Sequence, residues 1–183
     1  MTKGILHDAR DRLWAVATPP DMLAKLGWEM STLFDALKMK DVRVAAYFAL
    51  NGCLTAYHMT DWLQAALDSE ERWRDAQHVL NATTVREAVL KVPVLVACHQ
   101  IANATKHVFL SDAKSYKPGY KASHEPRLAE QDEAQHGLCI ETPEGREEIV
   151  WALYRAYEWW AATLRSLGYT VEPNAPIVSL DGA

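Results

Sequence analysis

Residues 41–68 constrain the fold most, because nearly every position of their helical pattern is apolar. A helix that is apolar on most of its sides is typically buried in the middle of a protein. One narrow arc of this pattern is polar, since at about 100° per residue Asn51, Thr55 and His58 project close together. Tyr47 lies on the same side. We therefore expect a central helix whose buried polar stripe needs partners on a neighbouring helix.

A second polar row offers those partners. His99, Asn103 and Lys106 follow one another at helical spacing within an otherwise apolar pattern that ends near His107. We expect this row to pack against the stripe of residues 41–68, with Asp61 joining the same cluster. Alternatively, a lone buried histidine bonded to an amide or hydroxyl is a common structural feature without chemistry.

Start and stop signals predict the remaining helices. Thr18 can cap a helix whose first turn holds two prolines and Asp21, and Thr84 with Glu87 forms a second capping box. Pro93 ends one short helix and begins the next. The expected helices are 18–38, 41–68, 72–80, 84–92, 93–107 and 146–167.

The helical period disappears between about residues 111 and 145, where prolines and glycines are frequent. Residues 137–141 predict one strand of a small hairpin, closed by a turn at 142–145. With 183 residues and no internal repeat, we expect an all-α fold: a single helical bundle over residues 1–170 with a long irregular loop or small β-hairpin insertion at about 111–145. Residues 171–183 are expected to form an extended or disordered tail.

The cysteines and charge indicate the compartment. Cys53, Cys98 and Cys139 are odd in number, and two of them fall in apolar helical patterns, which favours reduced core thiols over disulfides. No apolar run reaches the roughly 18 residues of a membrane span, and the first ten residues do not resemble a signal peptide. We expect a cytoplasmic protein that does not enter a membrane. The net charge of -5 argues against indiscriminate binding of polyanions, but it allows a local basic site.

The segment Asn103-Ala-Thr-Lys106-His107 resembles the signature of HEPN-domain proteins, all-α bundles in which an arginine, commonly followed by Asn, precedes a histidine by four to six residues. Asn103 and His107 fall where the family's polar residue and histidine lie, and Ala102 occupies the arginine position. The resemblance implies nucleotide or RNA binding, or a metal-independent ribonuclease of a host-defence or toxin system. It also implies a homodimer, because HEPN-like sites are usually assembled across a dimer.

Metal-free RNA cleavage needs a base, an acid and a cation. His107, with His58 or His99, would supply the first two, Lys106 the third, and Asn103 would orient the phosphate or ribose. Alternatively, Asn103 and His107 close the helix terminus while Lys106 favours its dipole. The binding residues expected around this site are His99, Asn51, Thr55, Asp61, Tyr47, Lys117 and Lys121.

The two lysines belong to a basic loop. Lys114, Lys117, Lys121 and Arg127 are interleaved with two tyrosines, a composition that suits single-stranded nucleic acid or phosphate. A solvated charged loop without a ligand is the alternative. A literal Arg-x5-His spacing also occurs from Arg72 to His78, on a polar segment.

Two other classes of function are open. His58, Asp61, His99 and His107 invite comparison with DinB-like metalloenzymes, but His99 and His107 stand about 12 Å apart along a helix, too far to share an ion easily. We therefore expect no metal or cofactor. Trp151 and Trp159 lie off the apolar face of the last helix and suit a protein partner, or else Trp159 covers the loop. The chain would then be a non-catalytic interaction or small-ligand-binding protein.

Overall fold

The computed structural model describes residues 16–106, 118–127 and 135–172. These residues are mostly helical, with a small antiparallel sheet of order β1-β2-β3 before the last helix. The predicted helical bundle is confirmed in outline, but three strands replace the expected hairpin, so the fold is not purely α. The elements are α2 Pro19–Lys38, α3 Val42–Ser69, α4 Trp73–Leu80, α5 Val85–Val89, α6 Pro93–Lys106, β1 Lys121–Arg127, β2 Gln135–Thr142, β3 Gly145–Glu148 and α7 Ile149–Ser166.

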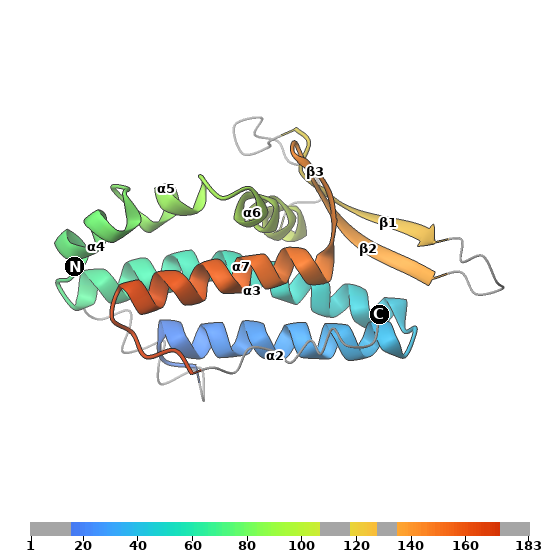
Figure 1. The fold of residues 1–183 in the computed structure, drawn as a ribbon, viewed down its shortest axis with the longest axis horizontal. Helices are drawn as coiled ribbons and strands as arrows, with labels where there is room; N and C mark the ends of the chain where they lie inside the picture. The colour runs from blue at the N-terminus through green and yellow to red at the C-terminus, as the bar shows by residue number, and fades with distance from the viewer. Residues whose placement is uncertain (1–15, 107–117, 128–134, 173–183) are drawn as a thin grey trace.

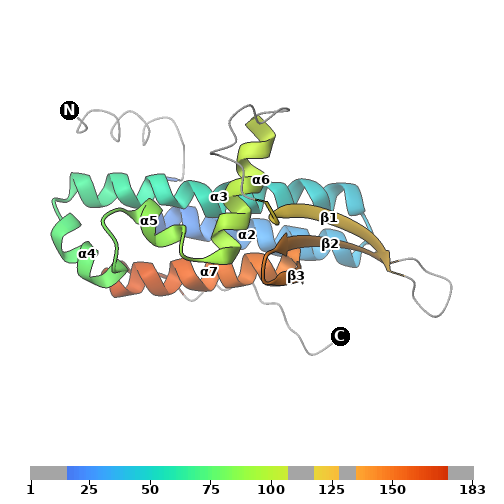
Figure 2. The same cartoon turned by 90° about the horizontal axis from the view of Figure 1, so that it is seen from above.

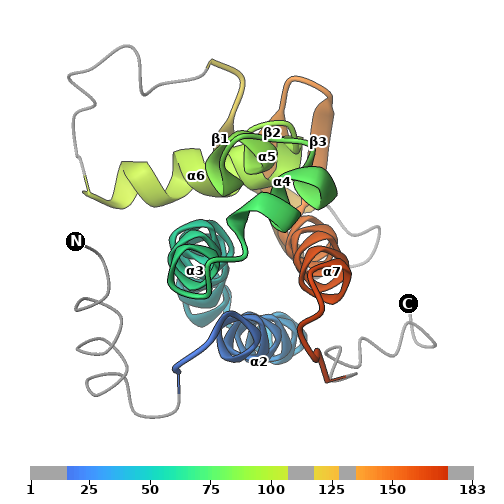
Figure 3. The ribbon, with the colours of Figure 1, turned by 90° about the vertical axis from the view of Figure 1, so that its left-hand side faces the viewer.

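The three long helices α2, α3 and α7 lie side by side and form the body of the fold (Figure 1). Viewed along their axes, they occupy the corners of a triangle (Figure 3). The short helices α4 and α5 run along one side of this body. Helix α6 crosses α3 and α7 at a steep angle and projects beyond α3, while β1 and β2 extend toward the opposite end from α4 (Figure 2). The crossing of α6 over α3 positions the candidate site.

Small residues let α3 sit close to its neighbours. Ala45, Ala49, Gly52 and Ala56 are buried and face the core. A Cβ added at Gly52 would lie only 2.7 Å from Leu153 Cδ1 of α7, so these two helices pack at a distance that a larger residue would not allow.

Helix α2 begins as its sequence predicts. The Asp21 amide donates to Thr18 Oγ1 at 3.3 Å, and the Asp21 carboxylate accepts from the Thr18 amide at 2.8 Å. Together with Pro19 at the first position, this reciprocal pair satisfies amide donors that the first helical turn leaves open. The predicted capping box is confirmed.

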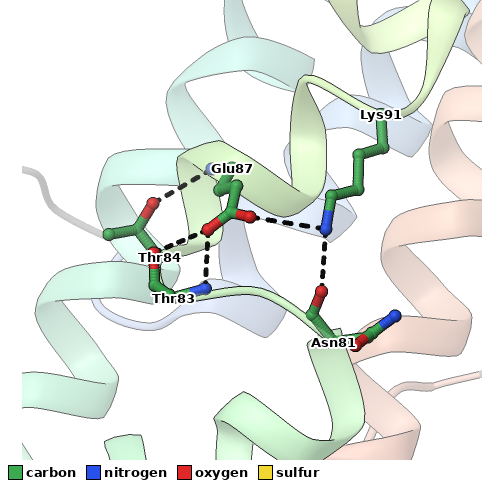
Figure 4. Close-up of polar contacts among 5 residues, drawn as sticks. All are labelled: Asn81, Thr83, Thr84, Glu87 and Lys91. Carbon is green, nitrogen blue, oxygen red and sulfur yellow. Dashed lines mark hydrogen bonds and ion pairs between the residues drawn. The ribbon is translucent and has the colours of Figure 1, made fainter.

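The start of α5 departs from its prediction in one detail. Thr84 Oγ1 accepts from the Glu87 amide at 3.0 Å, as expected, but the Glu87 carboxylate reaches back to the amide of Thr83, at 2.7 Å, and not of Thr84 (Figure 4). Hydrogen bonds from Thr83, with the charge of Lys91, lower the pKa of Glu87. Lys91 also donates to the Asn81 carbonyl at 2.8 Å. This network ties α5 back to the end of α4.

Strand β3 delays the start of the last helix. Strand β2 pairs with β1 on one side and with β3 on the other. We expected a helix from residue 146, which is wrong by three residues: Arg146 pairs with Glu141 as part of β3, and α7 begins at Ile149. Ladder pairing satisfies the backbone of residues 145–148, so the turn at 142–145 leads into a strand before the helix.

Residues beyond α7 tie it to the end of α3. Arg72 donates to the Leu167 carbonyl, and the Tyr169 hydroxyl donates to Glu70 at 3.2 Å. Burial, then the charge of Glu70, raises the pKa of Tyr169 to about 12. The arginine of the Arg72–His78 spacing is therefore engaged in holding the fold together. Gly168, at φ 79, ends the helix as expected.

Within the described residues, no helix has the length and apolarity needed to cross a bilayer.

Candidate functional site

The crossing of α6 over α3 brings an aromatic and a polar group together. The rings of Tyr57 and His99 are stacked, with centroids 4.2 Å apart and planes 23° from parallel. One turn further along α6, Asn103 Nδ2 lies 2.8 Å from His99 Nε2. The ring of His58 stands 6.2 Å from that of Tyr57. We call Tyr57, His58, Asp61, His99 and Asn103 the α3–α6 site.

The Asn103 contact defines the state of His99. An amide nitrogen is only a donor, so Nε2 of His99 accepts and carries no proton in this arrangement. His99 is also buried, with 6% of its surface exposed. An imidazole held in this way fixes the ring of Tyr57 but is not available as a general base. The structure thus favours the alternative of a bonded, buried histidine for His99.

Two nearby charges act on the Tyr57 hydroxyl. Burial raises the pKa of Tyr57, the positive charge of Arg86 on α5 lowers it, and the negative charge of Asp61 raises it further. Tyr57 is partly buried, whereas Arg86 and Asp61 are exposed. Sequence reasoning missed both Tyr57 and Arg86. The aromatic residue directly before His58 was the available signal for Tyr57, whereas Arg86 sits on a five-residue helix whose placement no local pattern predicts.

The predicted packing of the two polar rows is wrong in its residues. Helices α3 and α6 do contact each other, but the stripe of Asn51, Thr55 and His58 does not meet α6 as a unit. Asn51 and Tyr47 are exposed, the latter by 54%. The side of α3 that faces the core carries its small residues and Met59. Because this side packs closely against α7 at Gly52, the polar stripe lies on the outside or toward α2.

Thr55 belongs to a different polar cluster, between α2 and α3. Lys25 Nζ donates to Thr55 Oγ1 at 2.6 Å and pairs with Glu29 Oε1 at 2.5 Å. Only 3% of the Glu29 side chain is exposed, against 41% for Lys25. We refer to these three residues as the α2–α3 ion pair network. A glutamate among Leu26, Met30 and Leu33 on an apolar face was a signal of this network in the sequence.

We expect Lys25→Met to destabilise the fold by about 1–2 kcal/mol, because it leaves the buried Glu29 carboxylate without a cation. The partial exposure of Lys25 keeps the cost below that of breaking a fully buried pair. The double variant Lys25→Met/Glu29→Met removes both charges and should recover most of this loss. Urea denaturation measures both. A double variant less stable than Lys25→Met would contradict the assignment.

The last turn of α6 carries Asn103 and Lys106 of the HEPN-like resemblance. Lys106 is the last residue of the helix, and His107 lies outside the described residues. The position that the family gives to arginine is Ala102, of which 1% is exposed. The position is therefore part of the core.

The basic loop is described only at its end. Lys114 and Lys117 lie outside the described residues, as does the side chain of Arg127. Lys121 pairs with Glu141 across the sheet at 3.1 Å, and a hydrogen bond from Lys121 lowers the pKa of Glu141. The charge of Lys121 is therefore compensated, which weakens its candidacy as a phosphate-binding residue.

The cysteines are core thiols, as predicted: Cys53, Cys98 and Cys139 are all free and buried. A hydrogen bond with Cys98, followed by burial, raises the pKa of Cys53 well above its usual range. Among the described residues, no group of three or more histidine, cysteine or acidic side chains is arranged to hold a metal ion.

The tryptophans of α7 differ in exposure. Trp151 is 39% exposed, as expected. The expected exposure of Trp159 is wrong, because it is partly buried and its ring meets Trp160 edge to face at 4.8 Å. Only Trp151 presents a large aromatic surface on this helix within the described part of the chain.

Comparison with protein-family models, curated proteins and solved structures finds no match for this chain. The HEPN-like resemblance therefore rests on the residues of this sequence.

Proposed function

We propose that this protein binds RNA at the α3–α6 site and cleaves it without a metal ion, in the manner of HEPN-domain ribonucleases. The observation that supports the proposal is the Tyr57–His99 stack, held by Asn103, which precedes Lys106 and His107 in the sequence by three and four residues. A partly exposed aromatic ring beside polar groups suits an unpaired base, because every base offers a face for stacking.

The residues divide the chemistry between them. His107 is the proposed base that takes the proton of the 2'-hydroxyl, and His58 is the proposed acid for the leaving oxygen. Lys106 supplies positive charge to the phosphorane, although it lacks the planar fork of the family's arginine. His99 and Asn103 orient Tyr57 and the bound nucleotide.

We further propose that the protein is a homodimer, in which the α6 termini of two copies together complete the site. The projection of α6 beyond α3 supports this arrangement, since it carries the end of α6 away from the body of its own chain (Figure 3). The free, buried cysteines support a cytoplasmic location.

Fluorescence anisotropy with a labelled single-stranded RNA in EDTA tests the binding step. We expect Tyr57→Ala to weaken binding about tenfold, since stacking on one aromatic side chain is worth about 1–3 kcal/mol per base. Tyr47→Ala is the matched control, because Tyr47 stands about 15 Å away along the same helix and contacts Arg43. The proposed site would be refuted if the wild-type protein did not bind the RNA, or if the two variants lost the same amount of RNA affinity.

A non-catalytic interaction protein is the second candidate. Trp28 is 62% exposed and meets Phe48 edge to face, so α2 and α3 present aromatic surface outside the α3–α6 site. Exposed aromatic side chains are enriched in protein interfaces. The same titration distinguishes the two candidates, because an interaction protein of this kind has no reason to bind RNA through Tyr57.

A further inference from the structure

The α3–α6 site has an aromatic ring and an imidazole, but its buried Ala102 leaves it without the family's arginine. RNA carries a negative charge at every phosphate, so affinity for it depends on cations placed near the bases that are bound.

Helix α5 is held against α3 next to this site. Val85 and Val89 are completely buried, and the Val85 amide donates to Gln64 Oε1 of α3 at 3.1 Å. Gln64 lies on the same side of α3 as Tyr57, two turns further along the helix. Arg86 follows Val85 directly, and it is exposed while its neighbour is anchored. A side chain that starts from a fixed backbone reaches its ligand at a smaller entropic cost.

Electrostatics agrees with this placement. Arg86 and Asp61 act on the pKa of the Tyr57 hydroxyl with opposite signs, which is consistent with the position of α5 that the Val85–Gln64 hydrogen bond fixes. Arginine is suited to phosphate because its planar guanidinium donates two parallel hydrogen bonds to one phosphate group.

We propose that Arg86 binds an RNA phosphate beside the base stacked on Tyr57, and so supplies from α5 the cation that α6 lacks. This inference rests on the proposed RNA binding and names the phosphate contact within it. Asp61 repels the same phosphate and limits the affinity, so replacing Asp61 and replacing Arg86 should change the RNA affinity in opposite directions.

The test measures affinity for single-stranded RNA by anisotropy at several salt concentrations. We expect Arg86→Ala to weaken binding about tenfold and to reduce the slope of log affinity against log salt by about 0.7, the value for one phosphate contact on a single strand. Arg86→Lys should keep the slope and lose part of the affinity. Asp61→Asn should bind more tightly than the wild type.

Arg74→Ala is the matched control, since Arg74 is exposed on α4, which lies farther from α6 than α5 does (Figure 1). It should leave both the affinity and the slope unchanged. If the wild type binds RNA and Arg86→Ala binds with the same affinity and slope, the phosphate contact is wrong while RNA binding stands. If the wild type binds no RNA, the proposed function fails and this inference fails with it.

Discussion

Replacing Trp160 with alanine is expected to lower the free energy of unfolding by about 3–5 kcal/mol. Trp160 has no exposed surface, and its indole Nε1 donates to the Ala56 carbonyl of α3 at 2.9 Å. The substitution removes the largest side chain at the interface of α3 and α7, leaves a cavity and breaks this hydrogen bond. For a chain of this size, the midpoint of thermal unfolding should fall by about 6–20 °C.

Trp151→Ala provides the matched control, because Trp151 lies on the same helix and is 39% exposed. We expect it to cost less than about 1 kcal/mol. Trp160→Phe separates the two contributions, since it keeps an aromatic ring in the core but removes the donor to Ala56. Calorimetry or urea denaturation measures the stability of all three variants. Similar stabilities for Trp151→Ala and Trp160→Ala would contradict the described core.

The helices were predictable because their signals are local. Thr18 with Asp21, Pro93 and Gly168 each act on the backbone within one turn of their own position, and each marks a helix end in the structure. The sheet was harder to predict because strand pairing depends on residues distant in sequence. Arg146 and Glu141 pair across a turn, and nothing in the pattern of residues 146–148 distinguishes a strand from the first turn of a helix.

The site was predictable only in part. His99 and Asn103 were found because polar residues interrupt an apolar row, and the structure bonds them to each other and stacks His99 on Tyr57 of α3. Thr55 was assigned to the wrong partner. On a helix that is apolar almost all round, periodicity groups the residues that share a side but does not say which side faces which neighbour. Close packing of α3 against α7 at Gly52 is one of the contacts that decide this.

His107→Ala is expected to lower the rate of RNA cleavage by about 10²–10⁴-fold, the usual contribution of general acid–base catalysis. In the proposed reaction, the base removes the proton of the 2'-hydroxyl, the 2'-oxygen attacks phosphorus, and the 5'-oxygen leaves with a proton from the acid. The product therefore ends in a 2',3'-cyclic phosphate. Because no step requires a metal ion, EDTA should not inhibit the reaction.

Cleavage of a labelled RNA in EDTA, by the wild type and by His107→Ala, tests the proposed ribonuclease activity most directly. DNA of the same sequence is the matched substrate, since it lacks the attacking 2'-hydroxyl. We predict that the wild type cuts the RNA, leaves a cyclic phosphate and spares the DNA, and that the variant loses this activity while keeping its RNA affinity. RNA that stays intact with the wild type, or that His107→Ala cuts equally fast, would contradict a ribonuclease at the α3–α6 site.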